Sequence, residues 1–248
     1  TNLYYLPNNE QNLAYRAAAL LMEEFGIREG ISIRIRKFIP VSAGMAGGSS
    51  DAAAVLFGVN KMFGLGLSRK GLMGRGLRLG ADVPSCLMRG TALSEGIGEV
   101  LTPLAPMPQC QVLIAKPAVS VSTKTVYESL DSMELSKADH PDIDGMIQAI
   151  EARDINQVAG RFKNVLELVT AGRYPVIGQL EEEMKRQGAV NAVMSGSGPT
   201  VFGLFVNPQA ARRAYESLRF GEASGLARQV YLTNFFNTKG QEGDSYGK

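Results

Sequence analysis

The segment that most constrains this chain is a glycine-rich loop set between a strand-like and a helix-like pattern. Residues 31–37, ISIRIRK, alternate isoleucine with polar or charged residues, which predicts a strand with one buried face. The loop follows directly and contains Gly44, Gly47 and Gly48. From Ser49 onward the sequence predicts a helix with a serine cap and an acidic residue in its first turn.

This order of strand, glycine loop and helix suits two structures. Glycines let an anion approach the backbone, and a helix start offers unpaired N–H groups with a partial positive charge, so the loop could bind phosphate. The same glycines could instead form a tight turn that leads into a close-packed helix. The loop contains neither the Walker pattern nor the G-x-G-x-x-G of a dinucleotide fold, and glycine content alone leaves both interpretations open.

Strand and helix patterns interleave along the rest of the chain, which predicts an α+β protein with helices on one face of a sheet. Helical spacing is found at residues 8–26, 68–80, 122–130, 142–152, 174–187 and 208–219. Strand patterns are found at 111–117, 189–195, 200–206 and 228–233, and the segment 81–99 mixes a turn, a short strand and glycines. Prolines after Leu104 predict a boundary between domains 1–104 and 105–248, and the tail from Asn234 is polar enough to be loosely held.

Composition excludes several classes of function. The chain has 26 Lys and Arg against 24 Asp and Glu, so we expect no nucleic-acid partner. The apolar run Ala52–Val59 is far shorter than the roughly 20 residues of a membrane span, and no leader pattern opens the sequence, so we expect a cytoplasmic protein without a membrane partner. Cys86 and Cys110 lack a CxxC pattern and His140 is the only histidine, which argues against a disulfide, a metal site and Ser-His-Asp chemistry.

Four separated segments resemble the GHMP kinases, a superfamily of small-molecule kinases. Pro40–Ala53, PVSAGMAGGSSDAA, is similar to their second motif, P-x-x-x-G-L-G-S-S-A. The other segments are LGADVPSCLMRGTALSEGIGE (79–99), KPAVSVSTKTVY (116–127) and MSGSGPTVFGLF (194–205). Together they resemble the branch that phosphorylates the 2-hydroxyl of 4-diphosphocytidyl-2-C-methyl-D-erythritol in non-mevalonate isoprenoid biosynthesis. The resemblance implies an N-terminal α+β domain with the phosphate loop and a C-terminal ferredoxin-like α+β sandwich.

The resemblance also implies ATP and Mg²⁺ at the site, a cytidyl diphosphate sugar alcohol as acceptor, and roles for individual residues. Asp82 matches the catalytic base, although its position before Val-Pro also suits a simple turn residue. Aspartate is a weak base, so positioning must assist it. Thr123 would hydrogen-bond the acceptor and Tyr127 would pack on the cytosine ring, and their spacing places both on one helix face, although Tyr127 also suits a core position. The loop residues expected around the ATP phosphates are Pro40, Val41, Ser42, Ala43, Gly44, Met45, Ala46, Gly47, Gly48, Ser49 and Ser50.

A second glycine turn, an acidic residue after the loop and a basic run have structural explanations. Ser195–Thr200, SGSGPT, matches a second glycine turn that braces the phosphate loop. Asp51 could reach Mg²⁺ through water, but an acid in a first helical turn more often compensates the helix dipole, and we favour that role. A basic run at helical spacing predicts a solvated face, formed by Arg69, Lys70, Arg75 and Arg78.

The sequence also departs from the family pattern. The first motif, P-A-K-x-N-L with its catalytic lysine, and a following D-G-Y-H are absent from these 248 residues, so we expect them to be inactive or nearly so by themselves. Ala46 stands where many members have glycine, which predicts a negative φ at this position. Two alternatives stay open: another GHMP kinase of the homoserine or mevalonate type, or a catalytically inactive nucleotide-binding protein. We expect a monomer or a weak homodimer.

Overall fold

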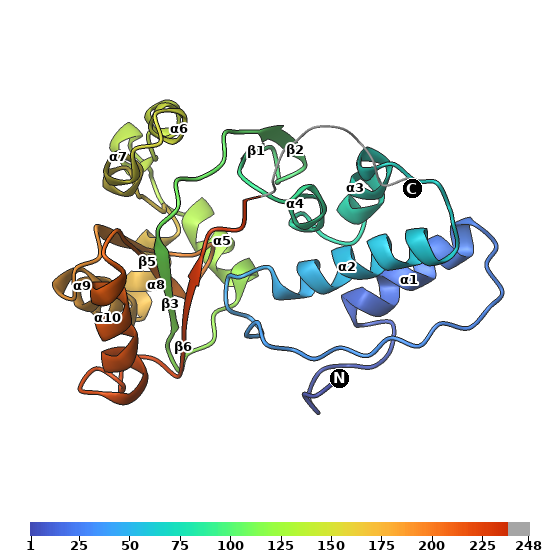
Figure 1. The fold of residues 1–248 in the computed structure, drawn as a ribbon, viewed down its shortest axis with the longest axis horizontal. Coiled ribbons are helices and arrows are strands. Elements are labelled where there is room, and N and C mark those ends of the chain that lie inside the picture. Colours follow the sequence, from blue (N-terminus) through green and yellow to red (C-terminus); the bar gives the residue numbers. More distant parts are fainter. Residues whose placement is uncertain (238–248) are drawn as a thin grey trace. The chain divides into compact units, whose positions relative to one another are not determined.

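The computed structural model describes residues 1–237 and separates them into two units (Figure 1). Unit 1 comprises Thr1–Val41, Ala46–Leu104 and Asn237, and unit 2 comprises Ser42–Met45 and Ala105–Phe236. Four residues of the glycine-rich loop therefore group with the second half of the chain. The predicted polar tail starts where the last strand ends, and its residues after 237 lie outside the described part.

Unit 1 is built around two helices that pack through alanine-rich faces. Its elements are α1 (Leu13–Glu24), α2 (Gly47–Met62), α3 (Arg69–Leu77), α4 (Val83–Met88) and the antiparallel hairpin of β1 (Ala92–Glu95) and β2 (Val100–Pro103). Asn12 caps α1 by accepting a hydrogen bond of 2.9 Å from the Ala14 N–H. Leu21 of α1 shares one core with Ala52 and Leu56 of α2. Small side chains at such a contact let two helices approach closely, because the distance between helix axes depends on the side chains that meet there.

Helix α4 occupies residues for which the sequence predicts only a turn and a short strand. Pro84 lies in its first turn, where the missing N–H of proline breaks no helical hydrogen bond. Val83 and Leu87 are buried in the same core as α2. Tertiary burial therefore stabilises a helix of six residues that is too short to show a clear period in the sequence.

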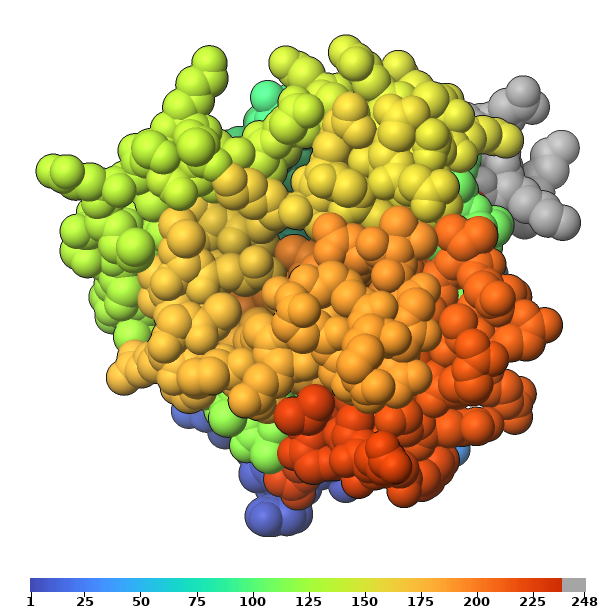
Figure 2. All heavy atoms as spheres, turned by 90° about the vertical axis from the view of Figure 1, so that its left-hand side faces the viewer, coloured from blue at the N-terminus to red at the C-terminus, as the bar shows by residue number. Residues whose placement is uncertain are grey.

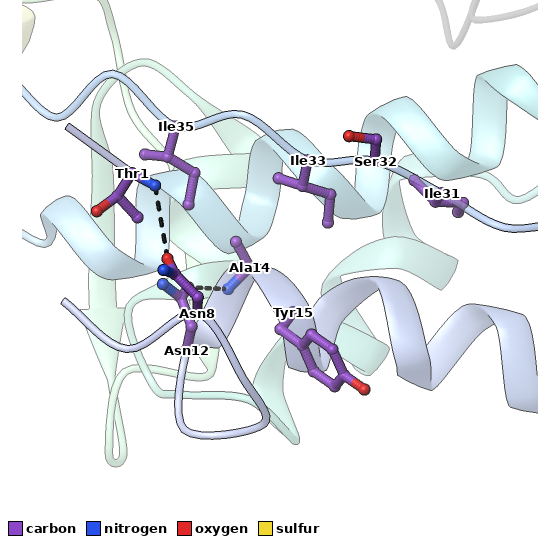
Figure 3. Close-up of a pocket in the computed structure, with 9 residues that line it drawn as sticks. All are labelled: Thr1, Asn8, Asn12, Ala14, Tyr15, Ile31, Ser32, Ile33 and Ile35. Atoms are coloured by element: carbon purple, nitrogen blue, oxygen red, sulfur yellow. Dashed lines mark hydrogen bonds between the residues drawn. The ribbon is translucent and has the colours of Figure 1, made fainter. Parts of the chain in front are cut away.

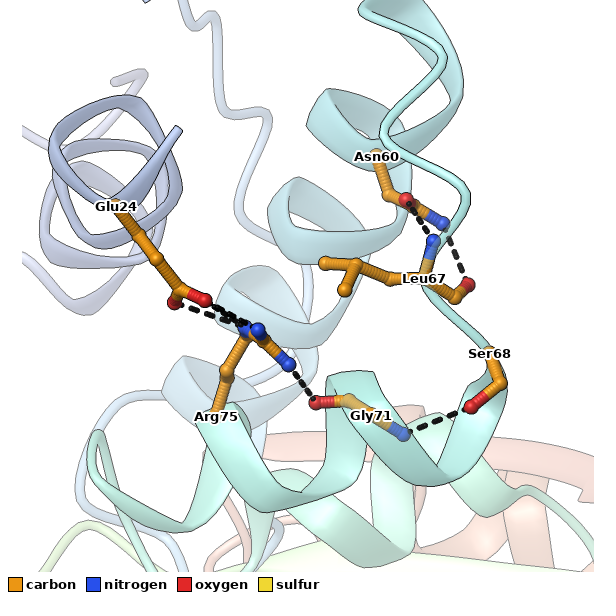
Figure 4. Close-up of polar contacts among 6 residues, drawn as sticks. All are labelled: Glu24, Asn60, Leu67, Ser68, Gly71 and Arg75. Carbon is orange, nitrogen blue, oxygen red and sulfur yellow. Dashed lines mark hydrogen bonds and ion pairs between the residues drawn. The ribbon is translucent and has the colours of Figure 1, made fainter. Parts of the chain in front are cut away.

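Side-chain hydrogen bonds fix the connection between α2 and α3 (Figure 4). The Asn60 amide bonds to both backbone groups of Leu67, each at 3.0 Å. Ser68 caps α3 by accepting a backbone N–H at 3.1 Å. Arg75 donates to the Glu24 carboxylate of α1 at 2.9 Å, so one residue of the predicted solvated basic face forms a partly exposed ion pair with another helix.

Residues 31–37 form no strand in the described part of the chain, so that prediction is wrong. The alternation does bring Ile31, Ile33 and Ile35 to one side, where they line a pocket of about 400 Å³ beside the start of α1 (Figure 3). Asn2 ties the end of the segment through hydrogen bonds of 2.7 and 3.3 Å with the backbone of Lys37. A strand requires ladder hydrogen bonds to a neighbouring strand, and no described segment supplies them here.

Unit 2 is a four-stranded antiparallel sheet with helices packed against it. Its strands are β3 (Gln111–Lys116), β4 (Asn191–Met194), β5 (Val201–Phe205) and β6 (Gln229–Asn234), in the spatial order β4-β5-β3-β6. Its helices are α5 (Thr123–Asp131), α6 (Ile143–Glu151), α7 (Ile155–Gly160), α8 (Glu167–Arg173), α9 (Val176–Arg186) and α10 (Pro208–Phe220), with a 3₁₀ turn η1 (Lys137–Asp139). With α9 and α10 as the crossover helices the chain runs β-α-β-β-α-β, the order of a ferredoxin-like fold, which confirms the predicted α+β class. The sequence predicts neither α7 nor α8, because helices of six and seven residues show little periodicity.

Both faces of this sheet are buried. Leu113 of β3 and Phe205 of β5 face a core that α9 and α10 cover, and the outer surfaces of these two helices are visible in Figure 2. Val112 and Leu204 point to the opposite face, as successive strand residues must, and pack there with Ala159 of α7. The prediction of helices on one face therefore holds for α5, α8, α9 and α10, which share the first core, but not for α7.

Candidate active site

The glycine-rich loop enters α2 through a left-handed residue. α2 begins at Gly47, and its N-cap residue Ala46 has φ +47° and ψ +29° with no side-chain cap. The predicted negative φ at Ala46 and the predicted cap at Ser49 are therefore both wrong. The helix starts earlier because the Ser50 N–H already bonds to the Ala46 carbonyl at 2.8 Å. The left-handed conformation costs alanine about 1–2 kcal/mol, so the surrounding contacts must enforce it.

The start of α2 offers free backbone donors. Ser50 is the first residue whose N–H bonds back into the helix, so the N–H groups of Gly47, Gly48 and Ser49 have no partner among the described residues. Unpaired N–H groups and the positive end of the helix dipole together favour an anion. Ser49 and Ser50 are only half-buried, and their hydroxyl groups form no hydrogen bond with the described residues that the structure shows.

A buried lysine lies beside this helix start. Only 5% of the Lys37 side chain is exposed, and its Nζ forms an ion pair with the Asp51 carboxylate. A Cβ on Gly47 would lie 3.1 Å from this Nζ and 2.8 Å from Ile39 Cγ2, so only glycine fits closely at this point. Asp51 is the fifth residue of α2 and pairs with Lys37, so its predicted place in the first turn is wrong. Lys37 is not among the residues singled out from the sequence, where its one signal is its place at the end of the alternating segment, just before the loop.

The first half of the loop packs against the glycine turn of residues 195–198, within unit 2. The Ser195 hydroxyl donates to the Gly44 carbonyl at 2.8 Å. Gly44 has φ +69°, and a Cβ there would lie 2.2 Å from the Ser195 carbonyl oxygen and 3.1 Å from the Gly198 carbonyl oxygen. Loop and turn therefore meet backbone to backbone, and the predicted contact between the second glycine turn and the loop is confirmed.

Asp82 lies in unit 1, immediately before the first residue of α4. Its side chain is exposed and makes no capping hydrogen bond. Its carbonyl accepts the Ser85 hydroxyl at 2.8 Å, and the adjacent Val83 is fully buried, so the backbone beneath the carboxylate is well anchored. Burial, followed by the charge of Asp82, raises the pKa of the Cys86 thiol, which keeps that thiol protonated and unreactive at neutral pH. The catalytic role of Asp82 stays a prediction.

Thr123 and Tyr127 lie one turn apart in α5 of unit 2. The Thr123 hydroxyl shares a hydrogen bond of 2.8 Å with the Ser197 hydroxyl of the glycine turn. Tyr127 is 51% exposed, which excludes the core position that its spacing also allowed. α5 thus carries a hydroxyl tied to the glycine turn and an open aromatic ring, and their roles in substrate binding stay predictions.

Unit 2 therefore connects loop residues 42–45, the turn 195–198 and Thr123 through direct contacts. Asp82 and the remaining loop residues belong to unit 1. Among residues 1–237 no group of three or more His, Cys, Asp or Glu side chains is placed to hold a metal ion. No helix in that range is long and apolar enough to cross a bilayer.

Comparison with known proteins adds the following sequence matches. A family model described as GHMP kinases N terminal domain matches residues 12–90, and one described as GHMP kinases C terminal matches residues 146–222. The 4-diphosphocytidyl-2-C-methyl-D-erythritol kinase of Lachnoclostridium phytofermentans is 54% identical over 239 residues, which cover 96% of this chain and 80% of the relative. The protein of the same name from Clostridium perfringens is 46% identical over 237 residues, covering 96% of this chain and 81% of the relative.

Solved structures agree with these matches. A crystal structure of 4-(cytidine 5'-diphospho)-2C-methyl-D-erythritol kinase has a TM-score of 0.76 at 31% identity, covering 94% of this chain and 81% of that one. The homoserine kinase of Cytophaga hutchinsonii has a TM-score of 0.79 at 20% identity, covering 94% of this chain and 78% of that one. Because its identity is only 20%, the homoserine kinase shows that the two proteins share a fold and nothing more.

Proposed function

The chain belongs to the GHMP kinases, and from this premise we propose that it transfers the γ-phosphoryl group of ATP to the 2-hydroxyl of 4-diphosphocytidyl-2-C-methyl-D-erythritol. The observation that carries the proposal is the identity of 54% and 46% with relatives of that name over 96% of the chain. The reaction is a step in the synthesis of isoprenoid precursors, and we place it in the cytoplasm, carried out by a monomer or a weak homodimer.

The phosphate loop supplies positioning and charge. Phosphoryl transfer depends mainly on holding donor and acceptor in line and on stabilising charge on the phosphate oxygens. In this proposal the free N–H groups of Gly47, Gly48 and Ser49 bind the ATP phosphates. The absence of a Cβ at Gly44 lets the loop pack against the turn 195–198, and its absence at Gly47 lets the helix start pack against Ile39. The rest of Pro40–Ser50 shapes the loop around them.

The residues that we assign to the acceptor are Asp82 in unit 1 and two residues of α5 in unit 2. Asp82 acts as the general base that takes the proton from the acceptor hydroxyl, and its exposed, uncapped carboxylate on an anchored backbone supports this role. Thr123 donates a hydrogen bond to the acceptor, and the exposed ring of Tyr127 stacks on its cytosine.

In this proposal Mg²⁺ binds together with ATP. Mg²⁺ prefers oxygen ligands, keeps several waters and usually binds through phosphates with one or two protein groups. The half-buried hydroxyls of Ser49 and Ser50 fit that donor set, because they lie on the first turn of the helix that offers its N–H groups to phosphate. When bound, the ion neutralises charge on the phosphate oxygens.

The decisive experiment compares wild type with Asp82→Asn in the protein expressed from its complete reading frame. Wild type should convert the cytidyl substrate and ATP to ADP and a phosphorylated product, and Asp82→Asn should lower kcat by about a hundredfold or more. Asp144→Asn is the matched control. Asp144 is also an exposed aspartate, but it lies in unit 2, and the variant should keep wild-type turnover.

Each alternative has its own outcome in this assay. Turnover of homoserine or mevalonate without turnover of the cytidyl substrate would establish another GHMP kinase. ATP binding without turnover of any of these alcohols would favour a catalytically inactive nucleotide-binding protein. Full activity of Asp82→Asn on the cytidyl substrate would refute the role of Asp82 while leaving the reaction in place.

A further inference from the structure

Three side chains from one short stretch hold the glycine turn 195–198 from the side of α8. The Asn164 amide nitrogen donates to the carbonyls of Met194 and Gly196, both at 2.8 Å. Glu167 accepts the Met194 N–H at 2.6 Å. Thr170 donates its hydroxyl to the Ser197 carbonyl at 3.3 Å. Side chains in and just before α8 thus satisfy four backbone groups of the segment 194–197: three carbonyls and one N–H.

Other groups of the same turn contact the candidate active site. The Ser195 hydroxyl holds the Gly44 carbonyl of the phosphate loop, and the Ser197 hydroxyl holds Thr123. All these residues belong to unit 2. The turn therefore lies between α8 and the two groups that the proposed function assigns to ATP and to the acceptor.

The turn needs this support because its own backbone fixes it weakly. Gly196 and Gly198 have positive φ values of +56° and +83°, a region in which glycine is conformationally free. Only two backbone hydrogen bonds close it in the described structure, from Ser195 to Thr200 at 2.8 Å and from Gly198 to Ser195 at 3.0 Å. Displacement of reacting groups by about 1 Å can cost a hundredfold in rate, so the position of this turn matters for transfer.

We infer that Asn164, Glu167 and Thr170 are positioning residues for phosphoryl transfer: they fix the turn 195–198, and through it the Gly44 part of the phosphate loop and Thr123. The inference rests on the proposed function for the identity of the reaction. The three residues contact neither ATP nor the acceptor in this account, and act through Ser195 and Ser197.

The surroundings of Glu167 support the assignment. Burial raises the pKa of Glu167, and burial followed by the charge of Glu167 raises the pKa of Glu181 in α9 to about 8. Glu181 is therefore protonated at neutral pH, which relieves its repulsion with the neighbouring Glu167 carboxylate. Of the neighbouring charges on α9, Lys185 lowers the pKa of Glu181 and Glu182 raises it. Glu167, which receives the Met194 N–H, thus lies beside a second, half-buried carboxyl group.

The test is a double-mutant cycle between Asn164→Asp and Ser195→Ala in the protein from its complete reading frame, with kcat and KM for ATP measured per folded molecule. Asn164→Asp keeps the shape but turns two donated hydrogen bonds into repulsive contacts, and should lower kcat/KM by about a hundredfold. Ser195→Ala removes the bond to Gly44 and should lower it by about tenfold. If Asn164 acts through the turn, the double variant should be no worse than Asn164→Asp alone.

Asn191→Asp is the matched control, because the Asn191 amide donates to the Ala159 carbonyl at 2.8 Å in the same unit but away from the turn. It should lower stability yet leave kcat/KM per folded molecule within about twofold of wild type.

If Asn164→Asp does not fold, Thr170→Val replaces it in the cycle, with an expected loss in kcat/KM of about two- to tenfold. Independent, multiplying effects of the two substitutions, or an equal loss in Asn191→Asp, would overturn the inference. If wild type phosphorylates a different alcohol, the proposed function fails, and the same cycle with that alcohol still decides the inference.

Discussion

Replacing Gly44 by alanine tests the backbone contact between the phosphate loop and the glycine turn. The added Cβ would lie 2.2 Å from the Ser195 carbonyl oxygen, far closer than a carbon and an oxygen can approach. The residue also has φ +69°, which costs an L-residue about 1–2 kcal/mol. Forcing the turn away adds about 1–3 kcal/mol, as overpacking does elsewhere. We therefore expect Gly44→Ala to lower the free energy of unfolding by about 2–5 kcal/mol.

The measurement is urea unfolding followed by far-UV circular dichroism, together with ATP affinity at a temperature where the variant stays folded. The loss should appear in the transition that reports unit 2, since Gly44 groups with that unit. ATP affinity should fall as well, because the loop that we propose binds the phosphates must move. Gly58→Ala in α2 is the matched control: its Cβ would meet nothing within 4 Å, so it should be neutral or more stable by up to about 1 kcal/mol.

The reasoning fails if Gly44→Ala unfolds within about 0.5 kcal/mol of wild type and binds ATP with unchanged affinity. That result would mean that loop and turn do not meet backbone to backbone in solution. The same conclusion would follow if Gly44→Ala and Gly58→Ala changed the free energy of unfolding by the same amount.

Two further predictions follow from the described residues. Ala46→Gly should raise the free energy of unfolding by about 0.5–1 kcal/mol in urea titrations, because glycine relieves the left-handed strain at φ +47° and loses part of the gain through its freer unfolded state; a destabilised variant would show that the residue is not left-handed. Since the pKa of Glu181 is raised from 4.5 to about 8, the folded state holds its proton more tightly than the unfolded state, so its contribution to stability is complete below about pH 4.5 and is lost as the pH rises to about 8. Glu181→Gln should flatten this part of the pH dependence of unfolding, and an unchanged slope would contradict the assignment.

The sequence predicted elements whose signals are local. Asn12 and the apolar spacing after it define α1, and the short apolar run within residues 111–117 defines β3. The kinase family was also accessible from sequence, because its motifs are contiguous stretches whose residue order is specific. Caps, periodicity and motifs all act over a few residues, so they can be read without knowing what lies beside them in space.

Long-range contacts decided the rest. Residues 31–37 have the alternation of a strand, yet they remain outside any sheet because a strand depends on a partner elsewhere in the chain. The same holds at Ala46, whose local preference for a negative φ is overridden by the packing around the start of α2.

The site shows the same division. Its glycine loop and Asp82 could be named from motifs, but Lys37 and Asn164 could not, since neither lies in a recognised pattern. Their importance arises from hydrogen bonds and ion pairs with segments 14 to 32 residues away, and the Ser195–Gly44 bond spans 151 residues. The sequence by itself determined the family and the main helices and strands, and it named the residues that we propose carry the chemistry. Only the tertiary structure decided how those residues are held, because such contacts exist only when distant segments are folded against each other.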